Sequence, residues 1–120
     1  MKQTAVIVCP GRGGYNKPEL GSITKRHLPK QSELIGRFDK VRESEGFTGV
    51  SELDQKGKFD HRLHLKPENS AALIFAAGYA DFKAVDPEQY DIVAVTGNSM
   101  GWYTALACAG AWQPEKAMSI

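Results

Sequence analysis

Two short apolar runs interrupt the mixture of polar and hydrophobic positions along the chain. Residues 4–9 and 92–95 are almost continuously apolar and rich in β-branched side chains, and each run leads into a glycine-containing turn. A short apolar run that ends in turn residues is typical of a strand buried in a parallel sheet. The pattern therefore predicts a buried strand at about residues 4–9 and another at about residues 92–95.

Three other stretches have helical spacing. Apolar side chains recur every three or four positions within residues 22–45, where Pro29 is expected to interrupt a continuous helix. A second helix is predicted at about residues 70–85, after a start at Pro67-Glu68-Asn69-Ser70. Its expected buried face consists of Leu73, Ala76, Ala77 and Ala80. Residues 102–109 predict a third helix, which Gly110 ends.

The segment between these helices is less regular. Residues 46–67 are polar, contain three glycines and carry only short apolar runs, which predicts an irregular excursion or a small hairpin. Elsewhere strands alternate with helices, and this order indicates an α/β fold built on a parallel sheet. With 120 residues, of which 42% are hydrophobic, the chain can bury one modest core, so we expect a single domain.

The second apolar run ends in a G-x-S-x-G motif, formed by Gly97, Ser99 and Gly101. In a nucleophile elbow this motif lies between a strand and a helix, and the glycines leave room for the close approach of both elements. The order of strand, motif and helix is present here, so Ser99 is the candidate nucleophile. The N–H of Met100, at the start of the helix, is a candidate oxyanion donor. The alternative is an ordinary loop in which Ser99 caps the helix.

The first apolar run also ends in a glycine-rich loop, Pro10-Gly11-Arg12-Gly13-Gly14-Tyr15. Sites in open parallel sheets form at the carboxyl ends of the strands, so this loop meets the elbow if the two strands are neighbours. A backbone N–H near Arg12 or Gly13 then supplies a second oxyanion donor. The glycine spacing fits neither phosphate-binding pattern, which argues against a nucleotide site. The alternative is that these glycines only permit a tight turn.

Together, the two loops resemble the malonyl-CoA:acyl carrier protein acyltransferase family. Members begin with a strand that runs into a P-G-Q-G-S-Q type loop, and later carry G-H-S-L-G-E-Y followed by an alanine-rich helix. Residues 10–15 and 97–111 resemble these motifs, and residues 69–77 resemble the helix that precedes the elbow strand. The resemblance implies a parallel-sheet core of the α/β-hydrolase-like kind with a nucleophile elbow, incomplete in this chain. Residues 1–120 are then expected to be the N-terminal part of a single catalytic domain.

By this resemblance, Ser99 accepts an acyl group from a coenzyme A thioester and passes it to the phosphopantetheine thiol of an acyl carrier protein. The expected acyl group is malonyl-like, as in fatty acid or polyketide synthesis, and no cofactor is implied. The implied oxyanion donors are the backbone N–H groups of Arg12 and Met100, and Gly11 and Gly13 belong to the substrate loop. The chain departs from the family pattern at four positions, namely Arg12, Ser70, Asn98 and Trp102.

No general base is evident for Ser99. The histidines are His27, His61 and His64, and all precede the elbow, whereas elbow enzymes place the catalytic histidine after the serine. In the family that this chain resembles, both this histidine and the arginine that binds the malonyl carboxylate lie beyond the position of Ile120. We therefore expect a fragment that is inactive by itself. The alternative enzyme class is a serine hydrolase, namely an esterase, a thioesterase or a patatin-like enzyme.

Several other functions are disfavoured. The formal net charge of +1 favours neither nucleic acid nor an anionic membrane as a partner. No apolar run approaches the length of a membrane span or a secretory signal, so a cytoplasmic protein is expected. His61 and His64 have no third ligand at a suitable spacing, which predicts exposed side chains and no metal site. Cys9 and Cys108 lie in apolar runs, which predicts small core residues rather than redox groups.

Overall fold

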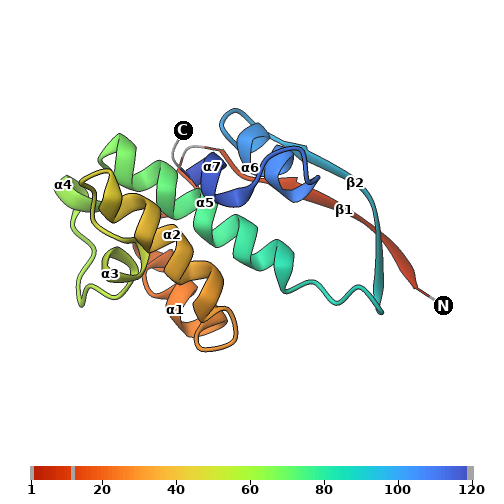
Figure 1. The fold of residues 1–120 in the computed structure, drawn as a ribbon, viewed down its shortest axis with the longest axis horizontal. Helices are drawn as coiled ribbons and strands as arrows, with labels where there is room; N and C mark the ends of the chain where they lie inside the picture. The colour runs from red at the N-terminus through yellow and green to blue at the C-terminus, as the bar shows by residue number, and fades with distance from the viewer. Residues whose placement is uncertain (1, 12, 119–120) are drawn as a thin grey trace.

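A computed structural model describes residues 2–11 and 13–118 of the chain. It contains two strands, one short 3-10 helix and seven α-helices (Figure 1). In chain order the elements are β1 (Gln3–Cys9), η1 (Lys17–Glu19), α1 (Ser22–His27), α2 (Ser32–Ser44), α3 (Val50–Asp54), α4 (His61–His64), α5 (Pro67–Lys83), β2 (Tyr90–Gly97), α6 (Gly101–Cys108) and α7 (Pro114–Met118). Among the described residues, no helix is both long and apolar enough to cross a membrane.

The two strands pair in parallel, although residues 10–89 lie between them in the chain. Gln3 lies opposite Tyr90 and Cys9 lies opposite Gly97, with one shift of register between Ala5 and Val6. Because the strands are parallel, both carboxyl ends lie at the same edge of the sheet. The glycine loop that follows β1 and the elbow that follows β2 are therefore neighbours.

Helix α5 is the centre of the molecule and contacts α1, α2, α3, α4, α6 and α7. Its residues Leu73, Ala76 and Ala80 are fully enclosed, as predicted, whereas Ala77 is only partly buried. Phe38 of α2 packs edge-on against Phe75 and Tyr79 of α5, with ring centroids 5.6 and 6.2 Å apart. Burial of a large side chain such as Phe38 contributes about 1.5–3 kcal/mol, so this contact joins the two longest helices firmly.

The predicted strands and helices are present, with some differences in extent. The helix expected at residues 70–85 begins earlier, at Pro67, since proline suits the first turn, where the N–H has no intrahelical partner. Pro29 lies in the break between α1 and α2, and Gly110, with φ at 82°, follows the end of α6. The α/β fold class with a parallel sheet is confirmed.

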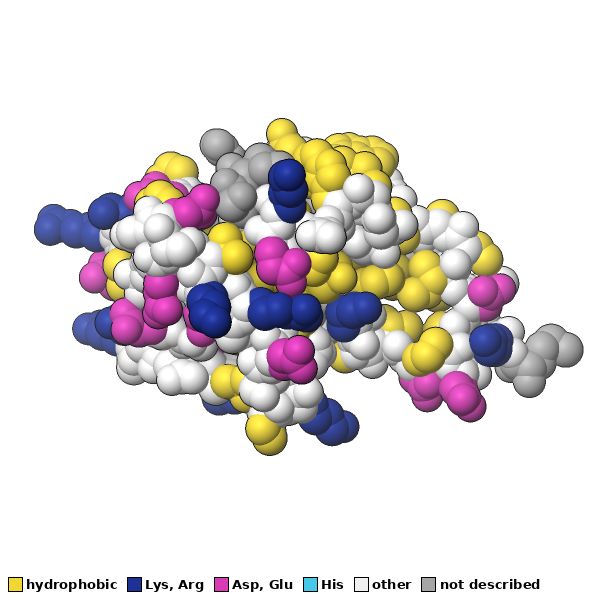
Figure 2. Space-filling model, viewed as in Figure 1, with side chains coloured by type: hydrophobic (Ala, Val, Ile, Leu, Met, Phe, Trp, Pro, Cys, Tyr) yellow, Lys and Arg dark blue, Asp and Glu magenta, His cyan; other side chains and the backbone are white. Residues whose placement is uncertain are grey.

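The strands are less buried than predicted. Side chains alternate along β1, so that Cys9 is buried whereas Val6 and Val8 are 54% and 69% exposed. On β2, Val93 is 59% exposed. The physical reason is that the sheet of the described residues has two strands, so that much of each strand is left uncovered. Figure 2 shows hydrophobic side chains at the surface over α6 and the strands.

The segment of residues 46–67 is not a hairpin, and this alternative is wrong. It contains two short helices, α3 and α4, joined by irregular chain. Val50 and Leu53 of α3 are fully buried in the main core. Helices of five and four residues are too short to display the periodicity by which a helix is recognised in a sequence.

Candidate active site

The turn between β2 and α6 has the backbone of a nucleophile elbow. Ser99 has φ at 56°, and it is the only non-glycine residue with positive φ among those described. This left-handed conformation costs a residue with a side chain about 1–2 kcal/mol, and such strain is concentrated at functional sites. Ser99 is exposed, so its hydroxyl lies within reach of a ligand. The N-cap position of α6 is Met100, with no side-chain capping bond, so Ser99 does not cap the helix.

The two elbow glycines are required by close backbone contacts. A Cβ atom on Gly97 would overlap the carbonyl group of Gly101, and a Cβ on Gly101 would overlap the carbonyl oxygen of Cys9. No side chain fits at either position without a shift of backbone. The second contact also joins the elbow to the end of β1.

The glycine loop of residues 10–15 lies directly against the elbow. A Cβ atom on Gly11 would overlap the carbonyl oxygen of Asn98 and would lie 3.1 Å from Cβ of Ser99. The N–H of Asn98 in turn donates to the carbonyl of Cys9 at 3.1 Å. The structure thus brings together the two loops that the parallel strand order placed at one edge of the sheet. Gly13, also in this loop, has φ at 84° and open space around it.

The structure describes only one of the two predicted oxyanion donors, Met100. Met100 follows Ser99 in right-handed conformation, and no hydrogen bond joins its N–H to another of the residues that the structure describes. Among the described residues, this N–H beside Ser99 therefore has no acceptor. Arg12 lies outside the described residues, so its proposed role stays a prediction from the sequence.

A cavity of about 790 Å³ adjoins the elbow and the glycine loop. Gly13 and Met100 form part of its wall, and Ser70 and Phe75 of α5 form another part. Most of its other lining residues are apolar, including Phe47, Leu65, Pro67, Ala71, Ala72, Tyr103, Ala117 and Met118. Ser99 is not one of its lining residues, but the neighbouring Met100 is.

One cation, Arg42, lies in the wall of this cavity and was not singled out from the sequence. Its side chain is buried and donates to the Thr48 carbonyl at 2.9 Å, to the Glu68 carbonyl at 3.0 Å and to Oδ1 of Asn69 at 2.6 Å. Burial lowers the pKa of Arg42, and nearby carboxylates partly oppose this shift. An arginine in a polar helix looks like a surface residue in the sequence, because only distant partners determine its burial.

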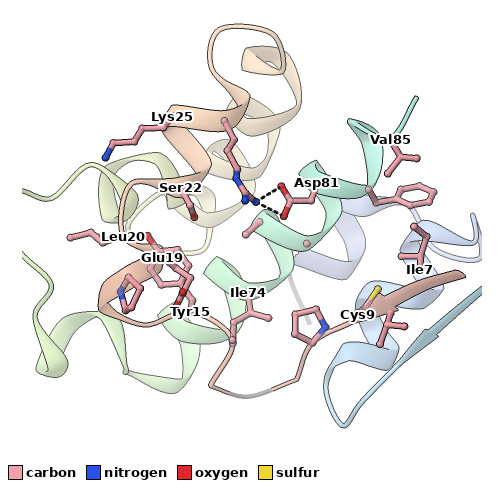
Figure 3. A pocket seen from close by; sticks show the side chains of 18 of the residues that line it. Ile7, Cys9, Tyr15, Glu19, Leu20, Ser22, Lys25, Ile74, Asp81 and Val85 are labelled. Carbon is pink, nitrogen blue, oxygen red and sulfur yellow. Dashed lines mark hydrogen bonds and ion pairs between the residues drawn. The ribbon is translucent and has the colours of Figure 1, made fainter. Parts of the chain in front are cut away.

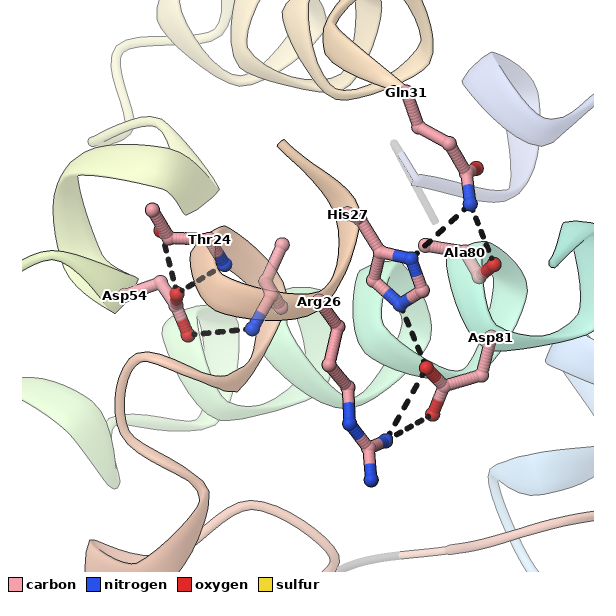
Figure 4. Close-up of polar contacts among 8 residues, drawn as sticks. Thr24, Arg26, His27, Gln31, Asp54, Ala80 and Asp81 are labelled. Atoms are coloured by element: carbon pink, nitrogen blue, oxygen red, sulfur yellow. Dashed lines mark hydrogen bonds and ion pairs between the residues drawn. The ribbon is translucent and has the colours of Figure 1, made fainter. Parts of the chain in front are cut away.

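None of the hydrogen bonds found among the described residues joins a histidine to Ser99. His27 is buried, with Nε2 2.6 Å from Oδ1 of Asp81 and Nδ1 3.1 Å from the amide nitrogen of Gln31 (Figure 4). Arg26 also pairs with Asp81, at 3.2 Å, so this cluster fastens α1 to α5. Asp81 borders a second cavity of about 630 Å³, whose wall also includes Cys9, Tyr15 and Ile74 (Figure 3).

The other two histidines differ in their burial. His61 is exposed, as predicted, but the prediction is wrong for His64, which is fully buried. Nε2 of His64 is 2.9 Å from the carbonyl oxygen of Leu53, and its ring stacks on Phe59 with centroids 4.9 Å apart. The contact with Leu53 joins α4 to α3. No cluster of potential metal ligands occurs among the described residues.

Both cysteines are free thiols in the interior, in agreement with the prediction of core residues. Cys9 is buried and Cys108 partly buried. Burial, together with the neighbouring Cys9 thiol, raises the pKa of Cys108 to about 12. Burial also raises the pKa of Cys9. A thiol with so high a pKa is protonated at neutral pH and therefore a poor nucleophile.

The fold and the elbow together define an α/β protein that presents a serine beside a glycine loop, and the solved structures to which this chain is similar include malonyltransferases. The acyl-carrier-protein S-malonyltransferase of Burkholderia pseudomallei matches with a TM-score of 0.76 and 21% identity. The malonyl CoA-acyl carrier protein transacylase of Coxiella burnetii matches with 0.75 and 22%. A malonyl-transacylase solved in complex with its type II PKS acyl-carrier protein matches with 0.77 and 20%.

These matches cover 98–99% of this chain but only 36% of each malonyltransferase chain. The chain therefore has the fold of part of a malonyltransferase and spans about a third of the length of these proteins. The sequence matches no protein-family model and no curated protein.

Proposed function

We propose that this chain carries the nucleophile of an acyltransferase, with Ser99 as the residue that becomes acylated. The observation that carries the proposal is the exposed, left-handed Ser99 with Gly11 packed against it. The names of the similar structures support the transfer of a malonyl-like group from coenzyme A to an acyl carrier protein. The two free thiols fit a reducing compartment such as the cytoplasm.

In the proposed reaction, the Ser99 hydroxyl attacks the thioester carbonyl and gives its proton to a general base. The oxyanion accepts hydrogen bonds from the N–H of Met100 and from the glycine loop, where we propose the N–H of Arg12. Collapse of the tetrahedral intermediate breaks the carbon–sulfur bond, and the coenzyme A thiolate takes the proton from the base. The carrier thiol then attacks the Ser99 ester by the same steps and frees the serine. This chemistry needs no cofactor.

We also propose that residues 1–120 form the N-terminal part of a longer catalytic domain. The similar malonyltransferase chains are nearly three times as long, and no histidine bonds to Ser99 among the described residues. A serine hydroxyl without a base is a weak nucleophile at neutral pH. Residues 1–120 alone are therefore expected to show negligible multiple turnover.

The test is mass spectrometry of the denatured full-length protein after incubation with malonyl-CoA. We expect a malonyl adduct that Ser99→Ala removes, and Ser70→Ala, which changes a hydroxyl in the adjoining cavity, should retain the adduct at Ser99. An unchanged adduct in Ser99→Ala contradicts the proposal. Carrier protein offered together with water distinguishes the acceptors, because release of free acid without acylation of the carrier indicates a serine hydrolase instead.

A further inference from the structure

The carboxylate of Asp54, at the end of α3, is buried with only 1% of the residue exposed. Its Oδ1 accepts from the Tyr15 hydroxyl at 2.5 Å and from the N–H groups of Gly21 and Ile23 at 3.2 and 3.3 Å. Its Oδ2 accepts from the N–H and the hydroxyl of Thr24 at 2.8 and 2.7 Å (Figure 4). No ion pair to Asp54 occurs among the described residues. These hydrogen bonds compensate for its burial.

Four of these five donors lie at the start of α1, in its N-cap residue Gly21 and in its first turn. The N–H groups at a helix start have no intrahelical partners, and a carboxylate there also interacts favourably with the helix dipole. The bonds from Gly21, Ile23 and Thr24 are thus accounted for by the capping of α1. The fifth donor, Tyr15, is not part of that helix and lies 39 residues before Asp54.

Tyr15 is the last residue of the glycine loop and is 1% exposed. Near the other end of the loop, Gly11 packs against Asn98 and Ser99. Between these ends, Gly13 and Gly14 lack side chains, and the Gly13 carbonyl accepts from Nδ2 of Asn16, its near neighbour in the chain, at 2.6 Å. Burial and the Asp54 carboxylate raise the pKa of Tyr15, so its hydroxyl remains a donor throughout the physiological range.

We propose that Asp54 is a positioning residue that acts through Tyr15 to hold the glycine loop against Ser99. This inference rests on the proposed function, since the loop is where a second oxyanion donor is expected. A preorganised donor stabilises an oxyanion without reorganisation during the reaction, so a loop that moves loses part of this effect. The segment of residues 46–67 thereby has a specific role, because it supplies the carboxylate that fixes this loop.

The test compares two variants that each remove one hydrogen bond to Asp54. Tyr15→Phe removes the bond from the loop, and Thr24→Val removes the bond from the Thr24 hydroxyl but leaves the loop untouched. Asp54→Asn is less informative because it also weakens the cap of α1. Amide hydrogen exchange of residues 10–15 and 97–100, measured in the 120-residue chain, reports loop mobility without any need for activity.

We expect Tyr15→Phe to accelerate amide exchange in residues 10–15 and 97–100 about tenfold relative to Thr24→Val. The reason is that loss of one hydrogen bond to a charged acceptor makes local opening easier by about this factor. In the full-length enzyme, Tyr15→Phe should lower the rate of Ser99 acylation about tenfold, with KM changed less than about twofold and Thr24→Val close to wild type. Equal exchange in the two variants, or equal acylation rates, overturns the inference. If wild type forms no Ser99 adduct, the proposed function fails, whereas the exchange comparison still decides whether Asp54 fixes the loop.

Discussion

At the scale of single residues, the elbow depends on two glycines that lack a Cβ atom. Gly97 and Gly101 each lie where a Cβ atom would overlap a backbone carbonyl group, and Gly101 faces the end of the neighbouring strand. Overpacking of such a contact forces backbone shifts that cost about 1–3 kcal/mol. Gly101 contacts Cys9, the last residue of β1, and the glycine loop follows directly after β1. A backbone shift at Gly101 is therefore expected to move the glycine loop relative to Ser99.

Gly101→Ala is expected to lower the free energy of unfolding by about 1–3 kcal/mol, because the new Cβ collides with the carbonyl of Cys9. The measurement is urea denaturation followed by circular dichroism. Gly36→Ala is the matched control, since Gly36 lies in α2 with nothing within 4 Å of an added Cβ. There the same change should stabilise the protein by about 0.5–1 kcal/mol. Similar losses in both variants contradict the proposed collision.

The strain at Ser99 gives a second prediction. Glycine adopts positive φ without a steric penalty, whereas alanine does not, so Ser99→Gly should be more stable than Ser99→Ala by about 1 kcal/mol. The denaturation midpoints of the two variants provide the comparison, and neither retains the hydroxyl. At an ordinary helical position alanine is the more stable of the two residues. A more stable Ser99→Ala therefore means that the turn is not left-handed at residue 99.

At the scale of elements, how much the sequence predicts depends on length and on the partners of each element. The periodicity of α5 extends over 17 residues, so this helix is evident in the sequence. The elbow is equally evident, since G-x-S-x-G reflects local steric requirements. In α3 the pattern spans five residues, and Asp54 looks like a surface residue because Tyr15 and Thr24, its distant partners, are not apparent from the sequence. The same holds for Arg42 in the cavity wall.

Helix α3 should therefore contribute to the core as a regular helix does. Leu53 is fully buried, and Leu53→Ala is expected to lower the free energy of unfolding by about 2–5 kcal/mol through lost burial and the cavity that remains. Urea denaturation measures the loss. Gln55→Ala, two residues later at an exposed position, should change stability by less than about 0.5 kcal/mol. A small effect of Leu53→Ala means that residues 46–67 are the loosely attached excursion that their composition suggested.

At the scale of the whole molecule, apolar side chains are buried more completely around α5 than on the sheet and α6. The helices around α5 enclose their apolar side chains, whereas the sheet and α6 leave several of theirs in contact with solvent (Figure 2). On the strands these are Val6, Val8 and Val93, and on α6 they include Trp102, Tyr103 and Leu106. Contiguous exposed apolar surface and unpaired strand edges favour association between molecules. The sheet and α6, between which the elbow lies, are thus a part of the surface that favours association.

The double variant Val6→Thr with Val8→Thr is expected to reduce self-association of the 120-residue chain without loss of stability. Threonine is β-branched and suits a strand, and its hydroxyl is solvated at positions that are 54% and 69% exposed. Light scattering at increasing concentration measures association, and urea denaturation measures stability. The matched control is Val50→Thr, at a fully buried position of α3, which should destabilise the protein because its hydroxyl enters the core. If the double variant is destabilised to the same extent as Val50→Thr, these strand positions are buried in solution, and the sheet is covered by contacts between copies of the chain.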